Sequence, residues 1–599
     1  MHVHQGSEIT VKVRNDGDME ATVHWHGLRL DNQYDGVPHE TQAPIPIGGT
    51  FTYKLQFPDP GIYWYHPHVR EDFGLEMGLY GTIVVEPANA TYWPAVDRFL
   101  TLTLDDLLVE DGHIASFSRS GPTFTAMGRF GNVMLTNGQT EFTGQVAVGE
   151  VLRLFVVNTA NTRIFNFAVR GARMKLVGGD SGRYERETFV DEILLSPSER
   201  AVIDVLFDEP GSVRLEHRTP DHVYDLGGFS VSGAATTNTS ASFELLRTDS
   251  ELSAERAALD DAFVREPDKV LSFVSRMPLL YDGAAVSTRS FSCPMHPDVE
   301  AATEGICPKC GMALVPAIED EPTPTLATYA CPMHPDVVGT GPDACPKCGM
   351  KLVLRGGAEP APAGSDNTAT YACPMHPDVV GTVPETCPKC GMKLVLRGGE
   401  QPTTTGETAA TYACPMHPDV IGTRPDTCPK CGMKLVLQAH DESAKTHSHS
   451  SGIGEHEEHH ESSDGLEWED LMPDINRASN SSNMIWQMID RETGAINGGI
   501  TWAFTVGDRV KIRLVNEMQS DHPMHHPFHI HGAGRFLVLS RDDIREPNLV
   551  WKDTVLVRAG QTVDILLDVT NPGLWMAHCH IAEHAQSGMM FSFDVARRS

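Results

Sequence analysis

Residues 526–532 read HPFHIHG and residues 578–589 read HCHIAEHAQSGM, and these two stretches decide how the chain is expected to fold. Each contains two histidines separated by one residue, and residues i and i+2 point to the same face of a β-strand. Two further pairs, H-W-H at 24–26 and H-P-H at 66–68, lie near the other end of the chain. Four strands could therefore aim eight imidazoles into one cavity. Such a donor set suits copper and suits magnesium or calcium badly.

Cys579 is the middle residue of the last pair, so its side chain points away from the two flanking histidines toward a second site. His526, His584 and Met589 can join it there. Two histidines, one thiolate and a weak axial methionine are the ligand set of a blue-copper electron-transfer centre. Only a few bonds then connect this one-electron site to the eight-histidine cavity. A single H-x-H pair is usually structural, but four pairs with a cysteine at these offsets indicate a metal centre.

The chain on either side of residues 291–464 has the pattern of β-structure. Segments such as ITVKVRN, VLRLFVVN and TVDILLDV alternate apolar and polar residues and are followed by turn formers. Many short strands with turn signals between them predict β-sandwich or barrel domains. The length that remains outside the insert suits three domains.

The composition is that of an ordinary globular protein. Of the 599 residues, 40% are hydrophobic and 21% are charged. No stretch of the sequence approaches the roughly 18 apolar residues that a membrane-spanning helix requires. The net charge of −33 argues against a nucleic-acid partner, because phosphate binding needs a basic surface. A cationic partner or a metal substrate is compatible with it.

Twelve of the 13 cysteines lie in four copies of one pattern, C-P-M-H-P-D-V followed by C-P-K-C-G-M. Each copy offers three cysteines, one histidine and two methionines as candidate metal ligands. Soft thiolate and thioether groups favour Cu(I). A structural zinc ribbon is the alternative, and a disulfide framework is also conceivable because twelve is an even number. The candidates are Cys293, Met295, His296, Cys307, Cys310 and Met312; Cys331, Met333, His334, Cys345, Cys348 and Met350; Cys373, Met375, His376, Cys387, Cys390 and Met392; and Cys414, Met416, His417, Cys428, Cys431 and Met433.

Spacers rich in Thr, Ala, Pro and Gly separate the repeats, and their composition predicts flexible linkers. Residues 438–464 form a low-complexity segment with six histidines, from His440 to His460. We expect this segment to be disordered. It either captures metal or serves as a solvated linker.

The histidine and cysteine motifs resemble those of the multicopper oxidases, over all of the chain outside the insert. The resemblance implies an all-β fold of three cupredoxin-like Greek-key sandwiches, the third interrupted by the repeats on flexible linkers. It implies that one-electron oxidations of a substrate feed the four-electron reduction of O2 to water. The implied segments are domain 1 at 1–88, domain 2 at 89–245, the linker and start of domain 3 at 246–290, the repeats at 291–437 (about 292–316, 329–354, 371–396 and 412–437), the histidine-rich linker at 438–464, and the rest of domain 3 at 465–599.

The resemblance also assigns ligands to four copper ions. The implied type 1 ligands are His526, Cys579, His584 and Met589. The implied type 2 ligands are His24 and His529. The implied ligands of the type 3 pair are His26, His66, His68, His531, His578 and His580. The repeats resemble the small heavy-metal-binding domains attached to copper and silver efflux proteins, which implies additional Cu(I) or zinc.

Two acids are candidates for delivering protons, which the reduction of O2 consumes. Asp35 follows His24 by eleven residues, where the family has an acid beside its trinuclear cluster. An aspartate before Gly36 is equally typical of a turn. Some bacterial members carry a glutamate directly after the second type 1 histidine, where this chain has Ala585. A relay that relies on that acid must differ here, and Glu583 is the candidate.

The leading functional hypothesis is a Cu(I) metallo-oxidase that serves copper tolerance. The insert is rich in soft ligands, it interrupts the domain where some cuprous oxidases carry a methionine-rich insertion, and tethering raises the local metal concentration. A laccase-like oxidase of phenols or aromatic amines uses the same ligands, and a copper sequestration or delivery protein is the non-enzymatic alternative. The expected partners are therefore O2 and either Cu(I) or a small aromatic reductant.

The family is usually exported, so a periplasmic or extracellular location is expected. No signal peptide is visible in this sequence. The first histidine motif begins at residue 24, without the first strands expected of a cupredoxin domain. We therefore expect an N-terminal truncation.

Overall fold

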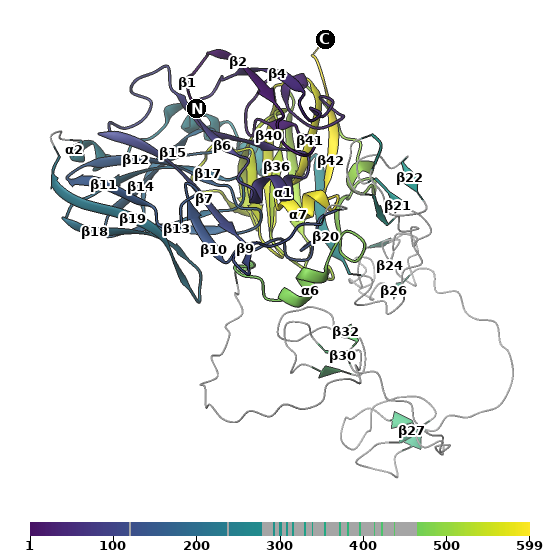
Figure 1. Ribbon diagram of the computed structural model, residues 1–599. Helices are drawn as coiled ribbons and strands as arrows, with labels where there is room; N and C mark the ends of the chain where they lie inside the picture. Colours follow the sequence, from purple (N-terminus) through teal and green to yellow (C-terminus); the bar gives the residue numbers. More distant parts are fainter. Residues whose placement is uncertain are drawn as a thin grey trace, which may run out of the picture. The chain divides into compact units, whose positions relative to one another are not determined.

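The computed structural model describes residues 1–118, 121–235, 239–277 and 464–598, with short strands and a few neighbouring residues between 278 and 463. Residues 1–318 and 410–599 form one compact unit, and residues 319–409 form another. The larger unit consists mostly of β-sheets (Figure 1). The all-β prediction is confirmed. No helix within the described ranges has the length and apolar character needed to cross a membrane.

The N-terminal sandwich consists of a four-stranded sheet, ordered β1-β6-β5-β3, and a two-stranded sheet, β2-β4. Its core contains Trp25, Tyr53 and Tyr63. Strand β2 alternates between exposed and half-buried residues, as a strand with one face toward the core should. The strands are β1 (His2–His4), β2 (Glu8–Arg14), β3 (Val23–His24), β4 (Thr50–Gln56), β5 (Gly61–Pro67) and β6 (Gly81–Glu86).

The middle sandwich pairs a six-stranded sheet, ordered β10-β7-β12-β17-β14-β15, with a five-stranded sheet, ordered β11-β19-β18-β13-β16. Its strands are β7 (Arg98–Leu107), β10 (Val133–Thr136), β11 (Thr143–Val148), β12 (Val151–Asn158), β13 (Phe165–Arg170), β14 (Arg173–Gly179), β15 (Gly182–Val190), β16 (Ile193–Leu195), β17 (Arg200–Leu206), β18 (Gly211–Arg218) and β19 (Val223–Ala234). A two-stranded ribbon, β8 (Val109–Glu110) and β9 (His113–Ile114), accompanies them.

Strand β12 joins the middle sandwich to the first one. Every residue of this strand is buried. Leu152 and Leu154 belong to the core of the middle sandwich. Phe155 and Val157, whose side chains point the other way, pack in a cluster with Trp64 of the first sandwich. Burial on both faces explains why VLRLFVVN is nearly continuous in apolar residues.

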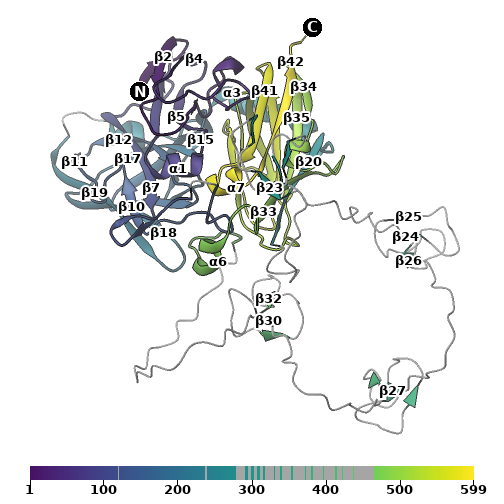
Figure 2. The same cartoon turned by 45° about the vertical axis from the view of Figure 1, so that its right-hand side comes forward.

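The C-terminal sandwich pairs a six-stranded sheet, ordered β33-β20-β35-β40-β37-β38, with a five-stranded sheet, ordered β34-β42-β41-β36-β39. Strand β20 (Lys269–Arg276) precedes the insert, yet it pairs with β33 (Ile485–Asp490) and β35 (Arg509–Asn516), which follow it. The insert is thus a long connection between neighbouring strands. Figure 2 shows this sandwich in yellow and green. The other strands are β34 (Ala503–Thr505), β36 (His526–Ile530), β37 (Gly534–Arg541), β38 (Ile544–Arg545), β39 (Thr554–Val557), β40 (Thr562–Val569), β41 (Gly573–Cys579) and β42 (Met590–Ala596).

Short helices connect these strands. Two of them matter for the site, because α1 follows the H-P-H motif and α7 follows the H-C-H motif, and the two contact each other. The helices are η1 (Asn32–Tyr34), α1 (Glu71–Glu76), α2 (Ser240–Phe243), α3 (Ser250–Ala257), α4 (Asp260–Val264), α6 (Pro473–Ala478), η2 (Asn497–Gly499) and α7 (Ala582–Gln586).

Each repeat of the insert contains a three-stranded sheet. The strands are β21 (Phe291–Ser292), β22 (Glu300–Ala301) and β23 (Val315–Pro316); β24 (Tyr329–Ala330), β25 (Val338–Gly339) and β26 (Val353–Leu354); β27 (Tyr371–Ala372), β28 (Val380–Gly381) and β29 (Val395–Leu396); and β30 (Tyr412–Ala413), β31 (Ile421–Gly422) and β32 (Val436–Leu437). Among the candidate repeat ligands only Cys293 and Cys307 are described. Met295, His296, Cys310, Met312, all candidates in the later repeats, and residues 438–463 lie outside the described residues.

Candidate metal centre

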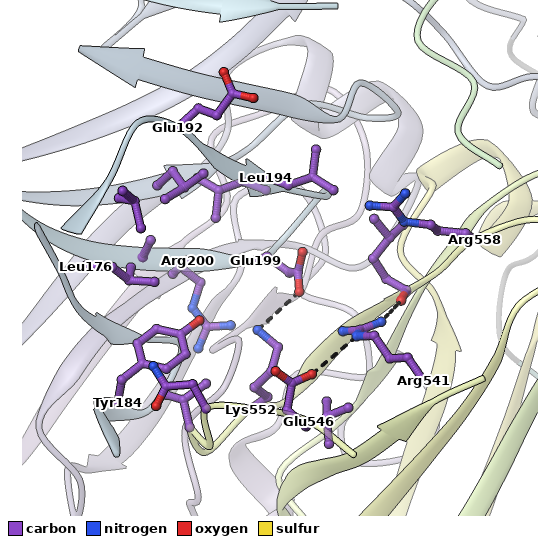
Figure 3. A pocket seen from close by; sticks show the side chains of 18 of the residues that line it. Leu176, Tyr184, Glu192, Leu194, Glu199, Arg200, Arg541, Glu546, Lys552 and Arg558 are labelled. Carbon is purple, nitrogen blue, oxygen red and sulfur yellow. Dashed lines mark hydrogen bonds and ion pairs between the residues drawn. The ribbon is translucent and has the colours of Figure 1, made fainter. Parts of the chain in front are cut away.

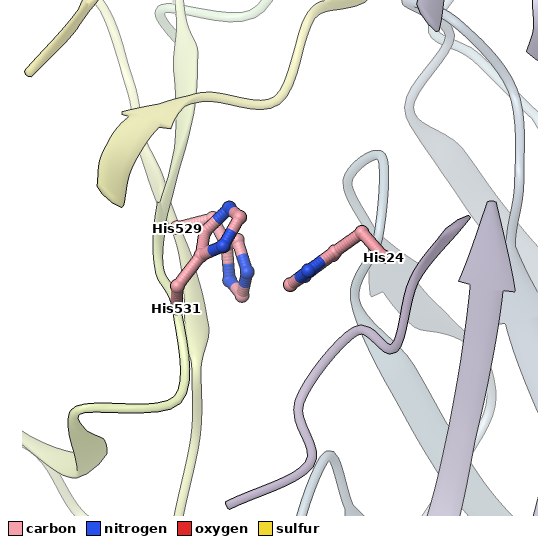
Figure 4. A group of neighbouring side chains, drawn as sticks. All are labelled: His24, His529 and His531. Atoms are coloured by element: carbon pink, nitrogen blue, oxygen red, sulfur yellow. The ribbon is translucent and has the colours of Figure 1, made fainter. Parts of the chain in front are cut away.

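Four strands bring the eight paired histidines together. The antiparallel pairing of β3 with β5 makes His24 the register partner of His66, and the pairing of β36 with β41 does the same for His529 and His578. The first and third sandwiches then face each other across the site (Figure 4). The ring centroids of His24 and His531 are 3.9 Å apart.

Six of the eight rings fall into two groups of three. Within each group the ring centroids are 5.0–5.8 Å apart. The groups are His26, His66 and His580, and His68, His531 and His578. His24 and His529 remain, with centroids 5.8 Å apart. The ring distances do not by themselves separate these groups, because the two shortest, 3.8 Å between His26 and His529 and 3.9 Å between His24 and His531, join rings of different groups. The assignment to a type 3 pair and a type 2 ion therefore stays a prediction from the resemblance.

Hydrogen bonds at one ring nitrogen fix the orientation of most of these imidazoles. His24 Nδ1 lies 2.8 Å from the carbonyl oxygen of Asp35, and His529 Nδ1 lies 2.9 Å from that of Asp553. His66 and His578 are held in the same way, through Nδ1, by the carbonyl oxygens of Pro67 and Cys579. A ring held through Nδ1 presents Nε2 to the cavity, as a metal ligand requires.

The nitrogen atoms on the other side of these rings have no hydrogen-bond partner among the described residues. They are His24 Nε2, His26 Nδ1, His66 Nε2, His68 Nε2, His529 Nε2 and His580 Nε2. A buried polar atom without a partner costs about 1–3 kcal/mol. Six such nitrogen atoms in one cavity therefore require an explanation. Copper ions bound between the rings would satisfy these atoms, and the residues therefore fit the group.

Cys579, His526 and His584 form a separate buried group. The Cys579 Sγ atom lies 3.5 Å from His526 Nδ1 and 3.8 Å from His584 Nδ1. The Ile581 backbone N–H donates to the same sulfur at 3.5 Å. Met589 is completely buried. Its backbone N–H donates to the His584 carbonyl oxygen, which closes the turn between these two residues. Burial raises the pKa of the Cys579 thiol, so a bound cation is needed to keep it a thiolate.

Trp486 covers this group. Its ring is stacked on that of His584, with centroids 4.0 Å apart, and its Nε1–H donates to the Thr125 carbonyl oxygen at 2.6 Å. His526 is 1% exposed and His584 is 0% exposed. The Cys579 group therefore lies in the protein core together with Trp486, which is itself 1% exposed.

Asp35 lies beside the eight-histidine cavity and also in a turn. Its position therefore agrees both with an acid near the cluster and with a turn-forming aspartate. Its Oδ2 atom is 2.7 Å from His531 Nδ1, and its Oδ1 atom is 3.4 Å from His24 Nδ1. Burial alone would raise the pKa of Asp35, but the two imidazoles outweigh burial and hold this pKa below its usual range. Asp35 therefore orients two rings as a carboxylate.

Glu71 is a second acid at the cavity, and the sequence analysis did not find it. Its Oε1 atom lies 3.1 Å from His66 Nδ1 and 3.6 Å from His580 Nε2. Burial, reinforced by neighbouring acids, raises the pKa of Glu71 well above its usual range. The available signal was its position three residues after the H-P-H motif. Glu583 lies in the same acidic cluster, where it accepts hydrogen bonds from Asn161 and Thr162 and where burial raises its pKa to about 7.

The middle sandwich contributes a buried ion pair that supports the cavity. The Arg200 side chain is 0% exposed, and its guanidinium donates to both carboxylate oxygens of Asp553 at 2.5 and 2.6 Å. Asp553 in turn holds His26 Nε2 at 3.0 Å. Gly27 allows this arrangement, because its φ is +83° and a Cβ atom there would lie 2.6 Å from Asp553 Oδ2.

A cavity of about 580 Å³ lies behind this ion pair (Figure 3). Lys552 reaches into it, with Nζ 3.1 Å from both Glu199 Oε1 and Asp180 Oδ2. Asp180 also lies 3.7 Å from Arg200. A series of charged groups thus connects the cavity to the histidines.

The buried imidazoles make the stability of the copper-free protein depend on pH. Burial lowers the pKa of nine site histidines below the ordinary value: His26, His66, His68, His526, His529, His531, His578, His580 and His584. Such groups bind protons more readily when unfolded, so they destabilise the fold as pH falls below the unfolded pKa. Buried acids whose pKa values burial raises act in the opposite direction but are fewer: Glu71, Glu76, Asp105, Asp106, Asp204, Glu467, Asp470 and Glu583.

We therefore expect the free energy of unfolding of copper-free protein to fall by more than about 1.4 kcal/mol per pH unit, the contribution of one fully shifted group, between pH of about 6.5 and 5. Urea unfolding at several pH values measures this slope. A stability that is flat or rises on acidification would show that the imidazoles are not buried as neutral groups.

The fold and the site define a class of protein. Its β-sandwich body holds a Cys-His-His group that one H-C-H strand joins to a cavity of eight histidines. Two family descriptions, both "Multicopper oxidase", match residues 1–90 and 472–599. A third, "Heavy metal binding domain", matches residues 291–317, 328–353, 370–395 and 411–437. The chain belongs to the multicopper oxidases and carries four heavy-metal-binding repeats, which confirms the resemblance seen in the sequence.

The chain matches each of its curated relatives over only part of that relative's length. A putative laccase-1 of Oryza sativa subsp. japonica is 31% identical over 215 residues, which are 34% of this chain and 36% of the relative. Copper resistance protein A of Pseudomonas syringae pv. tomato is 27% identical over 238 residues, which are 33% of this chain and 39% of the relative. The matched part thus spans less than half of either relative.

Solved structures are similar over the whole chain. A multicopper oxidase from Campylobacter jejuni, described as a metallo-oxidase, has a TM-score of 0.53 at 16% identity and covers 100% of this chain and 84% of its own. One from Pseudomonas Thermotolerans has a TM-score of 0.51 at 18% identity and covers 100% and 91%. At these identities the similarity concerns the fold.

Proposed function

We propose that the chain oxidises its substrate one electron at a time at the Cys579 group and reduces O2 to water at the eight histidines. When bound, copper supplies the one-electron chemistry at the first site and the oxygen chemistry at the second. The proposed type 1 ligands are His526, Cys579, His584 and Met589. The proposed type 2 ligands are His24 and His529, and the proposed type 3 ligands are His26, His66, His68, His531, His578 and His580.

The protein's own residues have distinct parts in this scheme. Cys579 provides the covalent connection between the two sites through the histidines on either side of it. Asp35 orients His531 and His24 by the contacts given above. The acidic cluster around Glu583 lies beside the cavity and can supply the protons that O2 reduction consumes, because a pKa near 7 allows a carboxyl group both to give and to take a proton at neutral pH.

We propose Cu(I) as the substrate, and the observation that carries this is the burial of the Cys579 group under Trp486. A phenol must bring its ring close to a ligand for rapid electron transfer, and the stacked indole occupies that position above His584. A metal ion held outside the protein core needs no such space. The soft ligands of the repeats and the relative named copper resistance protein A agree with this choice. A periplasmic location would suit such a function.

A laccase-like oxidase is the second candidate, because relatives named laccases match part of the chain. A copper sequestration or delivery protein would require neither an intact Cys579 group nor an intact eight-histidine cavity, and the structure retains both. Oxygen uptake with Cu(I) and with a phenol distinguishes these candidates. Uptake with neither, after copper loading, would favour sequestration.

Removing the insert tests its contribution. We expect a chain in which a short Gly/Ser linker replaces residues 291–464 to oxidise Cu(I) at least about 10-fold more slowly at limiting Cu(I), because the tethered ligands no longer raise the local concentration. The rate at saturating Cu(I) should change much less. The visible absorption of the Cys579 site is the control for an intact oxidase body. An unchanged rate at limiting Cu(I) would refute this role for the insert.

Removing the indole tests the closure of the Cys579 group. We expect Trp486→Ala to raise the rate of phenol oxidation by about 10-fold or more, although loss of a buried Trp costs about 3–5 kcal/mol of stability. Trp486→Phe, which keeps a ring over His584, is the matched control and should stay near the original rate. If the Trp486→Ala variant keeps its visible absorption and oxidises the phenol no faster than the original chain, Trp486 does not exclude phenols.

A further inference from the structure

The first repeat packs against the oxidase body. One hydrophobic cluster joins buried residues from both parts, with Val299 and Ala301 of the repeat partly buried at its edge. We call this cluster the repeat–body contact. The residues from the repeat are Cys293, Cys307 and Leu314, and those from the body are Val37, Met576, Ala585 and Met590. The periodicity and composition of the insert gave no sign of this contact, since its spacers have the composition of flexible linkers.

The body side of the repeat–body contact consists of covalent neighbours of the metal centre. Ala585 directly follows His584, and Met590 directly follows Met589. Met590 is also the register partner of His578 on the neighbouring strand. The first repeat therefore lies over the segment that supplies two ligands of the Cys579 group.

The repeat side of the contact carries two of the candidate metal ligands. Cys293 and Cys307 are each 1% exposed and belong to the Cys3His set of this repeat. The Lys309 backbone N–H donates to Cys307 Sγ at 3.4 Å, and the Cys293 N–H donates to the Val299 carbonyl oxygen at 3.1 Å. An N–H bond to sulfur within C-P-K-C stabilises a thiolate ready to bind a soft cation.

The first repeat also differs from the others in sequence, next to Leu314. The residue that follows C-P-K-C-G-M is Ala313 in the first repeat and lysine in the other three: Lys351, Lys393 and Lys434. Four residues later, Ala317 replaces Arg355, Arg397 and Gln438. Burying a lysine or arginine without a partner is costly, so loss of these long polar side chains suits a repeat that packs on another surface.

We propose that the first repeat is a docked electron-donor module, which holds substrate Cu(I) against the segment that carries His584 and Met589. The donor role rests on the proposed Cu(I) oxidation; the docking does not. Each bound Cu(I) loses one electron to the Cys579 site and leaves as Cu(II). Four such events supply the four electrons that, with four protons, convert one O2 to two water molecules. The other three repeats supply Cu(I) to the first.

Thiol alkylation tests the docking without any copper. In reduced, metal-free protein, Cys293 and Cys307 should react with N-ethylmaleimide at least about 10-fold more slowly than their sequence counterparts Cys331 and Cys345, because the body covers the first pair. Mass spectrometry of peptides gives each rate. The four cysteines share one local sequence pattern, so the comparison is internally matched. Equal rates would overturn the docking.

Paired deletions test the donor role. Replacing residues 291–317 by a Gly/Ser linker of equal length should lower Cu(I) oxidation at limiting Cu(I) by about 10-fold, whereas the same replacement of residues 328–353 should lower it less than about 2-fold. Both variants should keep the visible absorption of the Cys579 site. Equal losses from the two deletions would overturn the donor role. Retained phenol oxidation with no Cu(I) oxidation in the intact chain would instead refute the proposed substrate, while alkylation still decides the docking.

Discussion

Replacing Cys579 with serine is expected to abolish the intense visible absorption of the copper-loaded protein and to reduce oxygen consumption with every electron donor to background. A serine hydroxyl is a hard, protonated ligand that does not replace a thiolate in a site with two imidazoles. Cys579 also provides the connection to both flanking histidines, so the eight-histidine site would receive no electrons. The copper held by the eight histidines should remain bound, because their rings are fixed by other contacts.

Absorption spectroscopy, copper analysis and oxygen uptake on one preparation make this test complete. Met589→Leu is the matched control, because the axial position is the weakest ligand in such a group. That variant should stay coloured and active. A coloured Cys579→Ser variant would contradict the assignment of the Cys579 group.

Replacing Asp553 with alanine is expected to have the largest effect on stability. The change leaves the buried Arg200 guanidinium without its bidentate partner, and removing one partner of a buried ion pair costs about 3–5 kcal/mol. It also removes the contact at His26 and the oxygen that lies 3.7 Å from His529 Nδ1. We therefore expect the eight-histidine site to bind copper more weakly, in addition to the loss of folding free energy.

Urea unfolding of the copper-free variant measures the stability, and copper analysis after dialysis measures the second effect. The matched control is Asp16→Ala, which breaks an ion pair with Arg14 whose side chains are 65% and 69% exposed. Such exposed pairs contribute at most about 1 kcal/mol. If both variants lose the same small amount, the buried pair does not support the site.

The fold class and the core of the site were predictable because both depend on short-range pattern. A two-residue period fixes which side chains share a strand face, and this was enough to separate Cys579 from the histidines on either side of it. The division of the eight rings into two groups of three and a remaining pair followed from the resemblance alone, because the rings lie too close together for their distances to separate them.

The residues that the sequence analysis missed act over long separations. His26 and Asp553 are 527 residues apart in the chain, and the Arg200 that holds Asp553 comes from the middle sandwich, which has no histidine motif. Glu71 lies near a motif but gains its importance from burial. Trp486 was one of 8 tryptophans with no pattern around it. Burial and cross-domain contacts leave no periodic signal in a single sequence.

The central claim is that electrons from Cu(I) reach O2 through this chain and yield water. The most direct test is the ratio of Cu(I) oxidised to O2 consumed, measured with an oxygen electrode together with an assay for peroxide. The account predicts four Cu(I) per O2 and no peroxide. A ratio of two with stoichiometric peroxide, or no oxygen uptake with Cu(I) by the copper-loaded chain, would contradict it.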